Sequence, residues 1–333
     1  MKAIVIEKFG GPEVLQIADI ERPVAGPGQV LIKVAATSVN RPDIVQREGN
    51  YPPPPGESDI LGLEVSGTVV EIGPAEGTGS DVQITVGDRV AALVGGGGYA
   101  EYVVAYTGHC FKLPDSVSFI EAACLCETYI TAYLNVIELG NLGATETVLL
   151  HGGGGGVNTS AIQIIKALRP QAKIIVTAST GKVDRVSDLG VSQVIDYKQQ
   201  DFAQEIAHLT SKRGVDVILD HIGADYLGKN LKSLAVYGRL VLIGVMSGVK
   251  AEVNLAVVMV KRQQILGSVL RARPITEKSS IIARFGSAVL PHVASGAIQP
   301  LVSDVLPLAQ AADAHRLMES SQHFGKIVLE VSS

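Results

Sequence analysis

The sequence predicts an α/β protein in which a doubly wound parallel sheet is inserted into a β-rich domain. Short β-branched runs separated by Gly and Pro clusters fill the first 120 residues, and after Glu127 apolar runs alternate with helix-length segments. A stretch of five glycines, "HGGGGGVNTS", follows one of those runs. The 333 residues exceed what one hydrophobic core usually organises, so two domains are expected.

The first segment predicts an irregular β domain. Its strand-like runs are "AIVIEK", "VLIKVAA", "VSGTVVEIG" and "YAEYVVA", and the clusters "AGPGQ" and "YPPPPGES" separate them. The glycine-rich stretch 94–103 precedes a strand and not a helix. We therefore interpret it as a loop without a role in phosphate binding.

The middle segment predicts the parallel sheet. Its apolar runs are "ETVLL", "KIIVTA", "QVIDY", "VDVILD" and "RLVLIGV", and the helices expected between them cover 157–168, 182–189, 200–211 and 225–236. Strands that are apolar on both faces are typical of a buried parallel sheet.

After "QILGSVL", helices are expected near 278–295 and 308–319, before a final strand "GKIVLEV". We predict that 1–122 and 264–333 form one domain and that 123–263 form the inserted domain. The active site is expected in the cleft between them.

Composition excludes several classes of function. The net charge is −5 with no basic stripe, so nucleic acid is not an expected partner. The longest apolar runs are shorter than the roughly 20 residues of a membrane span, so no membrane association is expected. The N-terminus "MKAIVIEKFG" has no signal-peptide pattern, and the cysteines, Cys110, Cys124 and Cys126, form no disulfide framework or C-x-x-C pair. We expect a cytoplasmic protein with buried, reduced cysteines.

The glycine stretch has the context of a dinucleotide-binding loop. "TVLL" supplies the preceding strand and "SAIQIIKAL" the following helix, and G-x-G-x-x-G matches at Gly153 and Gly155. Asn158 replaces the third glycine, which ordinarily serves helix–strand packing. Gly156 and Val157 open the helix and are expected to join in binding the pyrophosphate. The alternative, a flexible linker, predicts a polar continuation, whereas this one is amphipathic.

The second strand of the sheet indicates which dinucleotide is bound. An Asp or Glu for the ribose 2′-hydroxyl is expected at its end, roughly 20 residues beyond the loop. That place reads Thr177 to Thr180, followed by Lys182. Ser179 and Lys182 suit a 2′-phosphate, which favours NADPH over NADH. The alternative for Lys182 is a solvated surface lysine.

Motifs along the whole chain carry a family resemblance. They are "GGPEVL", "SVNRPDIVQREGNYP", "LGLEVSGTVVEIG", "VGDRV", "GGYAEY", "TAY", the glycine loop, "DYKQQDF", "LGSVLRAR" and "GKIVLE". The chain resembles the medium-chain dehydrogenase/reductase superfamily and, within it, the zinc-independent quinone oxidoreductases. The tumour-suppressor-induced NADPH quinone oxidoreductases are the subgroup that it resembles most, with zeta-crystallin further off. The resemblance implies a Rossmann domain inserted in a GroES-like catalytic domain.

The resemblance also bears on metal binding. Zinc alcohol dehydrogenases of this superfamily bind catalytic zinc through a Cys where this chain has Asn40 and a His where it has Leu63, while Glu64 is kept. Neither Asn40 nor Leu63 supplies the ligand that zinc needs, and the structural zinc lobe with its four cysteines is missing. No metal is expected.

Site residues follow from the resemblance, position by position. Asn40 and Arg41 are expected beside the nicotinamide and the acceptor, with Tyr51 at the mouth of the cleft. Further cofactor contacts are expected from Thr131, Tyr197, Gly244, Val245, Ser268, Val269, Leu270 and Lys326. Alternatives stay open: Tyr51 packs on the proline turn, Val245 and Leu270 are core residues, and Lys326 caps the final strand.

The resulting hypothesis is an NADPH-dependent reductase that transfers hydride to quinones. An enoyl or 2-alkenal reductase is the first alternative, and a nucleotide-binding structural or redox-sensing protein without turnover is the second. No obligatory acid is assigned, because solvent can protonate a hydroquinone anion. A homodimer is expected through the edge strands of the Rossmann sheets, at "QILGSVL".

Overall fold

The computed structural model describes residues 1–74 and 83–331 and divides the chain into two compact units. Unit 1 comprises 1–130 and 270–333, and unit 2 comprises 131–269. The predicted fold class is confirmed, since unit 1 is β-rich and is interrupted by an α/β unit with a parallel sheet.

Unit 1 is built on a sheet of seven strands among the described residues. Its order is β14-β15-β3-β4-β5-β7, β6 pairs with β3, and β1 pairs separately with β2. The strands are β1 (Lys2–Ile6), β2 (Leu15–Asp19), β3 (Gln29–Val39), β4 (Glu64–Ile72), β5 (Arg89–Leu93), β6 (Tyr102–Tyr106), β7 (Cys110–Lys112), β14 (Val302–Pro307) and β15 (Lys326–Glu330). Alternate residues of β3, including Val30, Ile32 and Val34, enter one core with α10.

Helices and short helical turns complete unit 1. They are η1 (Pro12–Val14), α1 (Arg41–Arg47), η2 (Thr107–His109), α2 (Phe119–Ala122), the π-helical η3 (Leu125–Tyr129), α9 (Ile275–Ala294), η6 (Leu308–Gln310) and α10 (Ala311–Ser320). Asn40 begins α1 through a capping box with Asp43, and Pro42 lies in its first turn. This cap places the Asn40 side chain directly at the end of β3.

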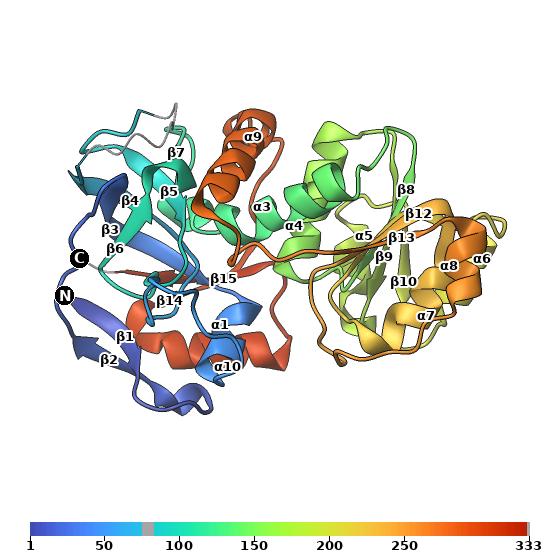
Figure 1. Ribbon diagram of the computed structural model, residues 1–333, viewed down its shortest axis with the longest axis horizontal. Helices are drawn as coiled ribbons and strands as arrows, with labels where there is room; N and C mark the ends of the chain where they lie inside the picture. The colour runs from blue at the N-terminus through green and yellow to red at the C-terminus, as the bar shows by residue number, and fades with distance from the viewer. Residues whose placement is uncertain (75–82, 332–333) are drawn as a thin grey trace. The chain divides into compact units, whose positions relative to one another are not determined.

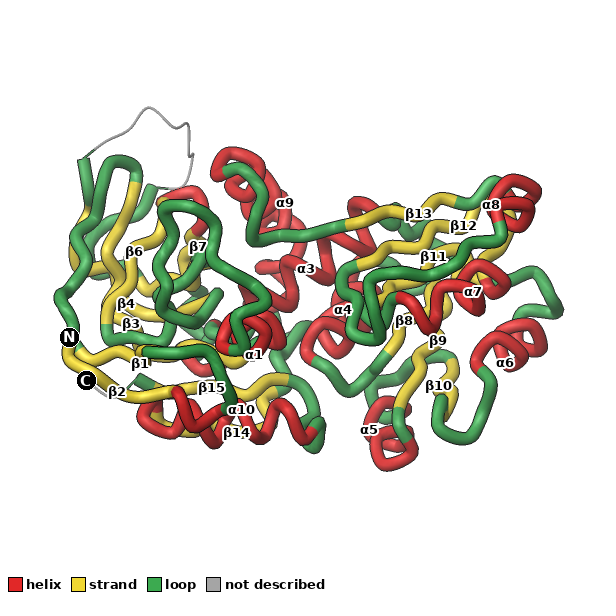
Figure 2. The backbone as a smooth tube through the Cα atoms, turned by 60° about the horizontal axis from the view of Figure 1, so that its bottom comes forward, coloured by secondary structure: helices red, strands yellow, loops and turns green. Residues whose placement is uncertain are grey.

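Unit 2 contains a sheet of six parallel strands, which Figure 2 shows side by side in the order β10-β9-β8-β11-β12-β13. The strands are β8 (Thr147–His151), β9 (Lys173–Ala178), β10 (Gln193–Asp196), β11 (Val215–Asp220), β12 (Leu234–Leu242) and β13 (Gln264–Gly267). The chain reverses its direction of winding beside β8. Ligands of such sheets bind at the carboxyl ends of the strands at this point.

Helices cover both faces of the parallel sheet (Figure 1). The set is α3 (Ile130–Ala132), the π-helical η4 (Tyr133–Leu139), α4 (Gly156–Leu168), η5 (Thr180–Lys182), α5 (Val183–Ser187), α6 (Phe202–Leu209), α7 (Ala224–Ser233) and α8 (Leu255–Lys261). Side chains of α6, α7 and α8 pack with those of the central strands in one core, while α5 packs on β9 and β10, and η4 packs on α4, β11 and β12. No helix among the described residues is long and apolar enough to cross a membrane.

Two sequence predictions of local structure were wrong. The helix expected over 225–236 ends at Ser233, because the apolar residues from Leu234 onward pair as β12 beside β11. β12 itself ends at Leu242, so Gly244 and Val245 lie in the following loop and not in the strand. The structure also contains α8 and the helical run 119–139, for which the sequence gives no helical pattern that we recognised.

Candidate active site

The glycine loop lies at the carboxyl edge of the parallel sheet, between β8 and α4. Gly152 has φ +76°, and the N–H groups of Gly152 and Gly153 both donate to the carbonyl of Thr177 on β9, at 3.0 and 2.8 Å. A Cβ on Gly153 would collide with Cγ1 of Val176. The loop therefore lies so close to the sheet that only glycine fits at Gly153.

The end of this loop exposes helix amides. Gly155 is the N-cap of α4, so Gly156 and Val157 carry the first N–H groups of the helix, which have no carbonyl partner within it. The helix dipole adds positive potential at the same place. These groups and the tight glycine turn fit a pyrophosphate.

Asn158, the departure from the glycine pattern, is part of the loop's internal scaffold. Its side chain is 3% exposed. Its amide nitrogen donates to the carbonyl of His151 and, at 3.1 Å, to that of Gly152. The larger residue does not push α4 off the sheet. Instead it ties the helix to the end of β8, so the substitution leaves the cradle intact.

Ser179, Lys182 and Tyr197 lie together at the end of β9. The Lys182 N–H donates to the Ser179 carbonyl at 2.8 Å, and the Tyr197 N–H donates to the carbonyl of Ala178 at 3.1 Å. Lys182 is half-buried, and burial together with Arg185 lowers the pKa of its ammonium. The acid nearest in sequence is Asp184, which is exposed on α5 beyond Lys182. The strand end thus offers hydroxyl groups and cations where an NAD-binding fold has a carboxylate.

The other predicted cofactor contacts of unit 2 lie on three segments. Thr131 is half-buried in α3, and its carbonyl accepts from the Asn135 side chain at 2.8 Å. Gly244 lies against His221, whose carbonyl would be 3.0 Å from a Cβ at Gly244. The Ser268 N–H donates to the Leu242 carbonyl at 3.0 Å, which holds this segment next to β12.

The alternative that Val245 and Leu270 are core residues is wrong for Val245 and holds for Leu270. Val245 is 50% exposed, so it is not a core residue, and Val269 is 58% exposed. Leu270, at 7% exposure, is buried in unit 1.

Unit 1 contains a buried polar cluster in which Asn40, Glu64 and Lys326 meet. Lys326 Nζ donates to Asn40 Oδ1 at 2.6 Å and to Glu64 Oε1 at 2.9 Å. The Asn40 amide nitrogen donates to the same Glu64 oxygen at 3.0 Å, and the Ser38 hydroxyl does so at 2.5 Å. All three residues of the cluster are at most 4% exposed. Lys326 thus does more than cap β15, because it fixes which way the Asn40 amide faces.

These residues do not fit a zinc ion. The cluster offers an amide and a carboxylate but no Cys or His side chain, and the Lys326 ammonium already takes the position of a cation between them. Within 1–74 and 83–331 no three His, Cys, Asp or Glu side chains are arranged to hold a metal.

A chain of hydrogen bonds next to the cluster joins the side chains of Arg47, His315, Tyr99 and Asp43. Arginine only donates, so Arg47 Nη1 donates to His315 Nδ1 at 3.3 Å, and His315 Nε2 then donates to the Tyr99 hydroxyl at 3.1 Å. Tyr99 donates to Asp43 at 3.5 Å. Burial lowers the pKa of His315 to about 3 and raises that of Asp43 to about 6. The neutral imidazole therefore holds α1 in place.

Tyr51 is held by Arg271, which the sequence analysis did not select. The guanidinium lies 5.1 Å from the centre of the Tyr51 ring and donates to the Tyr51 carbonyl at 3.3 Å. It also donates to Gln46 Oε1 at 2.8 Å and to the carbonyl of Gly95. Burial raises the pKa of the Tyr51 phenol, with a further increase from Glu127 that Arg271 partly offsets. The ring is thus packed against a cation as well as next to the proline turn.

Arg41 is not brought to this cluster. Its guanidinium donates to the carbonyl of Met318 on α10 at 3.4 Å. Burial lowers the pKa of Arg41, and the charges of Glu319 and Glu48 partly offset that effect. Asn40 and Arg41 are neighbours in sequence, but the Asn40 side chain bonds to Glu64 and Lys326, whereas the Arg41 side chain bonds to α10.

Glu127, the third residue of η3, was also missed by the sequence analysis. Its N–H donates to Glu64 Oε2 at 2.8 Å, which joins η3 to the polar cluster. Burial, and then the charge of Glu64, raise the pKa of its carboxyl to about 8. The available signal was a single acid within the apolar run "AACLCETYITAYL". Wide π turns of this kind occur often at functional sites.

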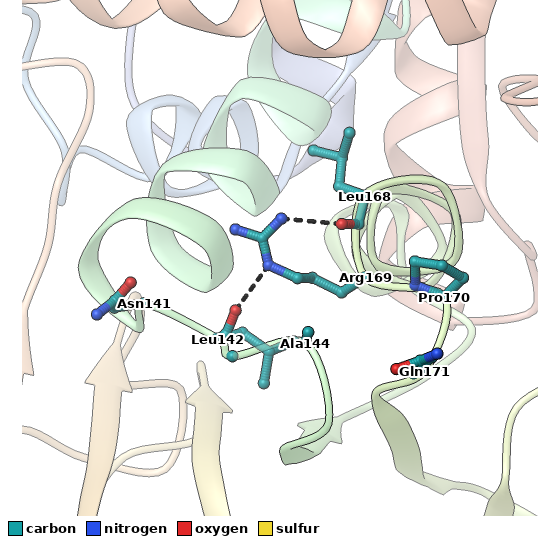
Figure 3. A pocket seen from close by; sticks show the side chains of 8 residues that line it. Asn141, Leu142, Ala144, Leu168, Arg169, Pro170 and Gln171 are labelled. Carbon is teal, nitrogen blue, oxygen red and sulfur yellow. Dashed lines mark hydrogen bonds between the residues drawn. The ribbon is translucent and has the colours of Figure 1, made fainter.

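Unit 2 also contains a hollow. It has a volume of about 430 Å³, and Arg169 crosses it, donating to the carbonyls of Leu142 and Leu168 at 2.8 Å each (Figure 3). Its lining comes from 141–144 and 168–171, which precede β8 and β9. It therefore lies at the amino edge of the sheet, where such folds do not bind nucleotides.

Two family models match the chain. Residues 26–115 match the alcohol dehydrogenase GroES-like domain, and residues 189–329 match a zinc-binding dehydrogenase domain. The second name implies a metal that the donor set around Asn40 does not fit.

Similar proteins extend over the whole chain. The quinone oxidoreductase of Lama guanicoe is 32% identical, with 99% of this chain and 97% of the relative covered. The solved quinone oxidoreductase of Escherichia coli, complexed with NADPH, has a TM-score of 0.86 and 29% identity over 99% of this chain and all (100%) of that one. A mycobacterial protein, also complexed with NADPH, has a TM-score of 0.88 and 32% identity over 99% and 100%. The chain therefore belongs to the medium-chain dehydrogenase/reductase superfamily, as an oxidoreductase of the quinone oxidoreductase-like type.

Proposed function

We propose that this protein is an NADPH-dependent, zinc-independent reductase of quinones. The observation that carries the proposal is the end of β9, where Ser179, Lys182 and Tyr197 lie together and residues 177–180 include no acid that could accept from a ribose 2′-hydroxyl. The placement beside the tumour-suppressor-induced subgroup is part of the proposal and rests on the shared motifs.

The glycine loop and the first turn of α4 would hold the pyrophosphate, and Ser179, Lys182 and Tyr197 the 2′-phosphate. Bound NADPH supplies a hydride from its nicotinamide ring. Thr131, Gly244, Val245, Ser268, Val269 and Leu270 are proposed to line the nicotinamide, while Asn40 and Tyr51 face the acceptor. Arg41 stays a prediction as a site residue, although its contacts lie on α10.

The polar groups of unit 1 would act by orientation. Lys326 and Glu64 fix the Asn40 amide, so one of its N–H groups is held in a set direction without rearrangement during the reaction. Tyr51 offers a phenol that burial keeps protonated. Both are donors for an oxygen on which negative charge develops.

The test is oxidation of NADPH, and of NADH as a control, with an ortho-quinone, a para-quinone and a short enone. Lys182→Glu should raise the NADPH KM at least tenfold and leave the NADH KM unchanged. Lys173→Glu is the matched control, since it makes the same charge change at the exposed, opposite end of β9. Tyr51→Phe should lower kcat without changing the NADPH KM.

Other outcomes separate the alternatives. Equal use of NADH would overturn the cofactor assignment. Turnover of the enone alone would favour a 2-alkenal reductase, and tight NADPH binding with no turnover of any acceptor would favour a nucleotide-binding structural or redox-sensing protein.

We also propose a homodimer. β13 is the edge strand of the parallel sheet, and the neighbouring α8 exposes Leu255, Met259 and Val260 at 74%, 72% and 67%. An apolar edge of this kind is a liability unless another chain covers it.

A further inference from the structure

Among the acids around Asn40, Glu127 differs in having an unpartnered carboxyl group. Glu64 accepts hydrogen bonds from Ser38, Asn40, Lys326 and the Glu127 N–H. The Asp43 carboxylate accepts from the N–H groups of Asn40 and Gly62, at 2.8 and 3.0 Å. The carboxyl of Glu127 makes no hydrogen bond and no close ion pair with any residue in 1–74 or 83–331.

The cations of the region are already engaged elsewhere. Lys326 binds Asn40 and Glu64, and the guanidinium of Arg271 binds Gly95, Gln46 and Tyr51. Lys278 Nζ donates to the Arg271 carbonyl at 3.3 Å and lies 3.9 Å from a Glu57 oxygen. None of them forms a hydrogen bond or a close ion pair with Glu127, so Lys326 and Arg271 lower its pKa through their charges alone and only partly offset the effect of burial.

The protonated form is therefore the stable one. Removal from water disfavours the carboxylate of Glu127, and the adjacent charge of Glu64 disfavours it further, which together raise its pKa to about 8. The groups that act on Glu127 or are acted on by it are Glu64 on β4, Lys326 on β15, Asp43 on α1, Cys126 on η3, Arg271 and Tyr51 on loops, and Lys278 on α9. Near neutral pH this carboxyl retains a proton that it can donate.

We propose that Glu127 is the proton donor when the acceptor is an enone, a role that rests on the NADPH-dependent hydride transfer of the proposed function. Glu127 is half-buried, and its N–H donates at 2.8 Å to the same Glu64 carboxylate that accepts from the Asn40 amide, so it belongs to the cluster that is proposed to face the acceptor. When an enone takes up hydride at its β-carbon, the C=C π pair moves to give an enolate. The O–H bond of Glu127 breaks, its proton bonds to the enolate oxygen, and the resulting carboxylate regains a proton from water. The enol then tautomerises to the saturated ketone.

The role distinguishes the two acceptor classes. A hydroquinone anion is stable enough for water to protonate it, whereas an enolate is much more basic and gains more from a placed acid. Glu127→Gln should therefore lower kcat for the enone by roughly 100-fold, the low end of general acid catalysis. Its kcat for a para-quinone should fall less than about threefold, because solvent serves that step.

The experiment compares wild type, Glu127→Gln and Glu127→Asp on both acceptors between pH 6 and 9.5. Wild-type kcat for the enone should fall as pH rises through about 8, Glu127→Gln should be slow and independent of pH, and Glu127→Asp should restore part of the rate. Glu71→Gln is the matched control, since Glu71 is half-buried at the far end of β4. NADPH binding, followed by fluorescence, should be preserved in every variant, and every variant should remain folded at the assay temperature.

Retention of the enone rate and of its pH profile in Glu127→Gln would overturn the role of Glu127 and leave the proposed function standing. Wild-type protein that turns over neither acceptor would instead overturn the proposed function. Reduction of quinones with no turnover of the enone would leave the proposed function standing and overturn the inference, because the step assigned to Glu127 would not occur.

Discussion

Asn158 shows how one residue can depart from a motif and preserve its purpose. A third glycine would let α4 approach β8 closely, whereas here a buried amide donates to two carbonyls, those of His151 and Gly152. A hydrogen-bonded side chain thus joins the helix to the strand, whereas a glycine would join them by letting their backbones approach closely. The glycine pattern alone could not reveal this, because it records only which positions tolerate no Cβ.

Asn158→Ala should destabilise the protein by about 1–3 kcal/mol, because it leaves buried carbonyls without their donor. Urea unfolding followed by circular dichroism would measure the change. Asn50→Ala is the control, since Asn50 is exposed and its substitution should have no effect. An unchanged midpoint for Asn158→Ala would contradict the scaffold role.

Glu127 makes a second prediction at this scale, on stability and not on catalysis. Its pKa of about 8 in the folded state lies above the roughly 4.3 of an unfolded glutamate. Between these values the unfolded state is ionised and the folded state holds the proton, so this group lowers the free energy of unfolding as pH rises.

Glu127→Gln removes that penalty. The variant should melt at a higher temperature than wild type at pH 8, and the difference should shrink toward pH 5. Scanning calorimetry at the two pH values would measure it. A difference that is the same at both, or larger at pH 5, would show that the carboxyl is ionised in the folded protein.

At the scale of elements, β15 joins the end of the chain to the polar cluster at the end of β3. Lys326 opens β15 and bonds to Asn40, which follows β3, and to Glu64, which opens β4. The ion pair is almost fully buried, with side-chain exposures of 3% and 0%. Its partners are separated by 262 residues in sequence, so neither strand can shift without breaking it.

Lys326→Met should cost roughly 3–5 kcal/mol, because it leaves the Glu64 carboxylate buried without a countercharge. The double variant Lys326→Met, Glu64→Gln should recover a large part of that loss, since no unpaired charge remains. Chemical unfolding of the two single variants and the double variant forms a complete cycle. Strict additivity of the two single effects would argue against the coupling.

For the whole molecule, much of the architecture could be predicted from the sequence. The alternation of apolar runs and helical segments predicted the parallel sheet, and the glycine loop was found at the junction of β8 and α4. Asn40 and Lys326 were selected through the resemblance, and the structure brings them into contact.

The parts that could not be predicted depend on long-range contacts. α8, with the apolar sequence "LAVVMVK", has no polar face to give a helical period. The proposed roles of Glu127 and Arg271 depend on contacts with residues distant in sequence, Glu64 and Tyr51, respectively. Local pattern also failed at Leu234, where pairing with β11 overrides the helical spacing.

The edge of the parallel sheet gives a prediction for assembly. Ile265→Lys combined with Met259→Lys should convert the proposed dimer to a monomer, because two charges would be buried at the contact. Val24→Lys, at an apolar residue of unit 1 that is 78% exposed, is the control and should leave the assembly unchanged. Sedimentation velocity would distinguish these results, and a wild-type monomer would refute the dimer.

The Lys326 ammonium also determines how the site obtains its cation. Zinc alcohol dehydrogenases of this superfamily must acquire their catalytic cation after synthesis, compete for it with other proteins and reject the wrong ion. Here the cation between Asn40 and Glu64 is encoded in the chain and arrives when β15 pairs with β3. For the zinc-independent reductase that we propose, completion of this site would coincide with completion of the fold, and its readiness would not depend on the supply of metal.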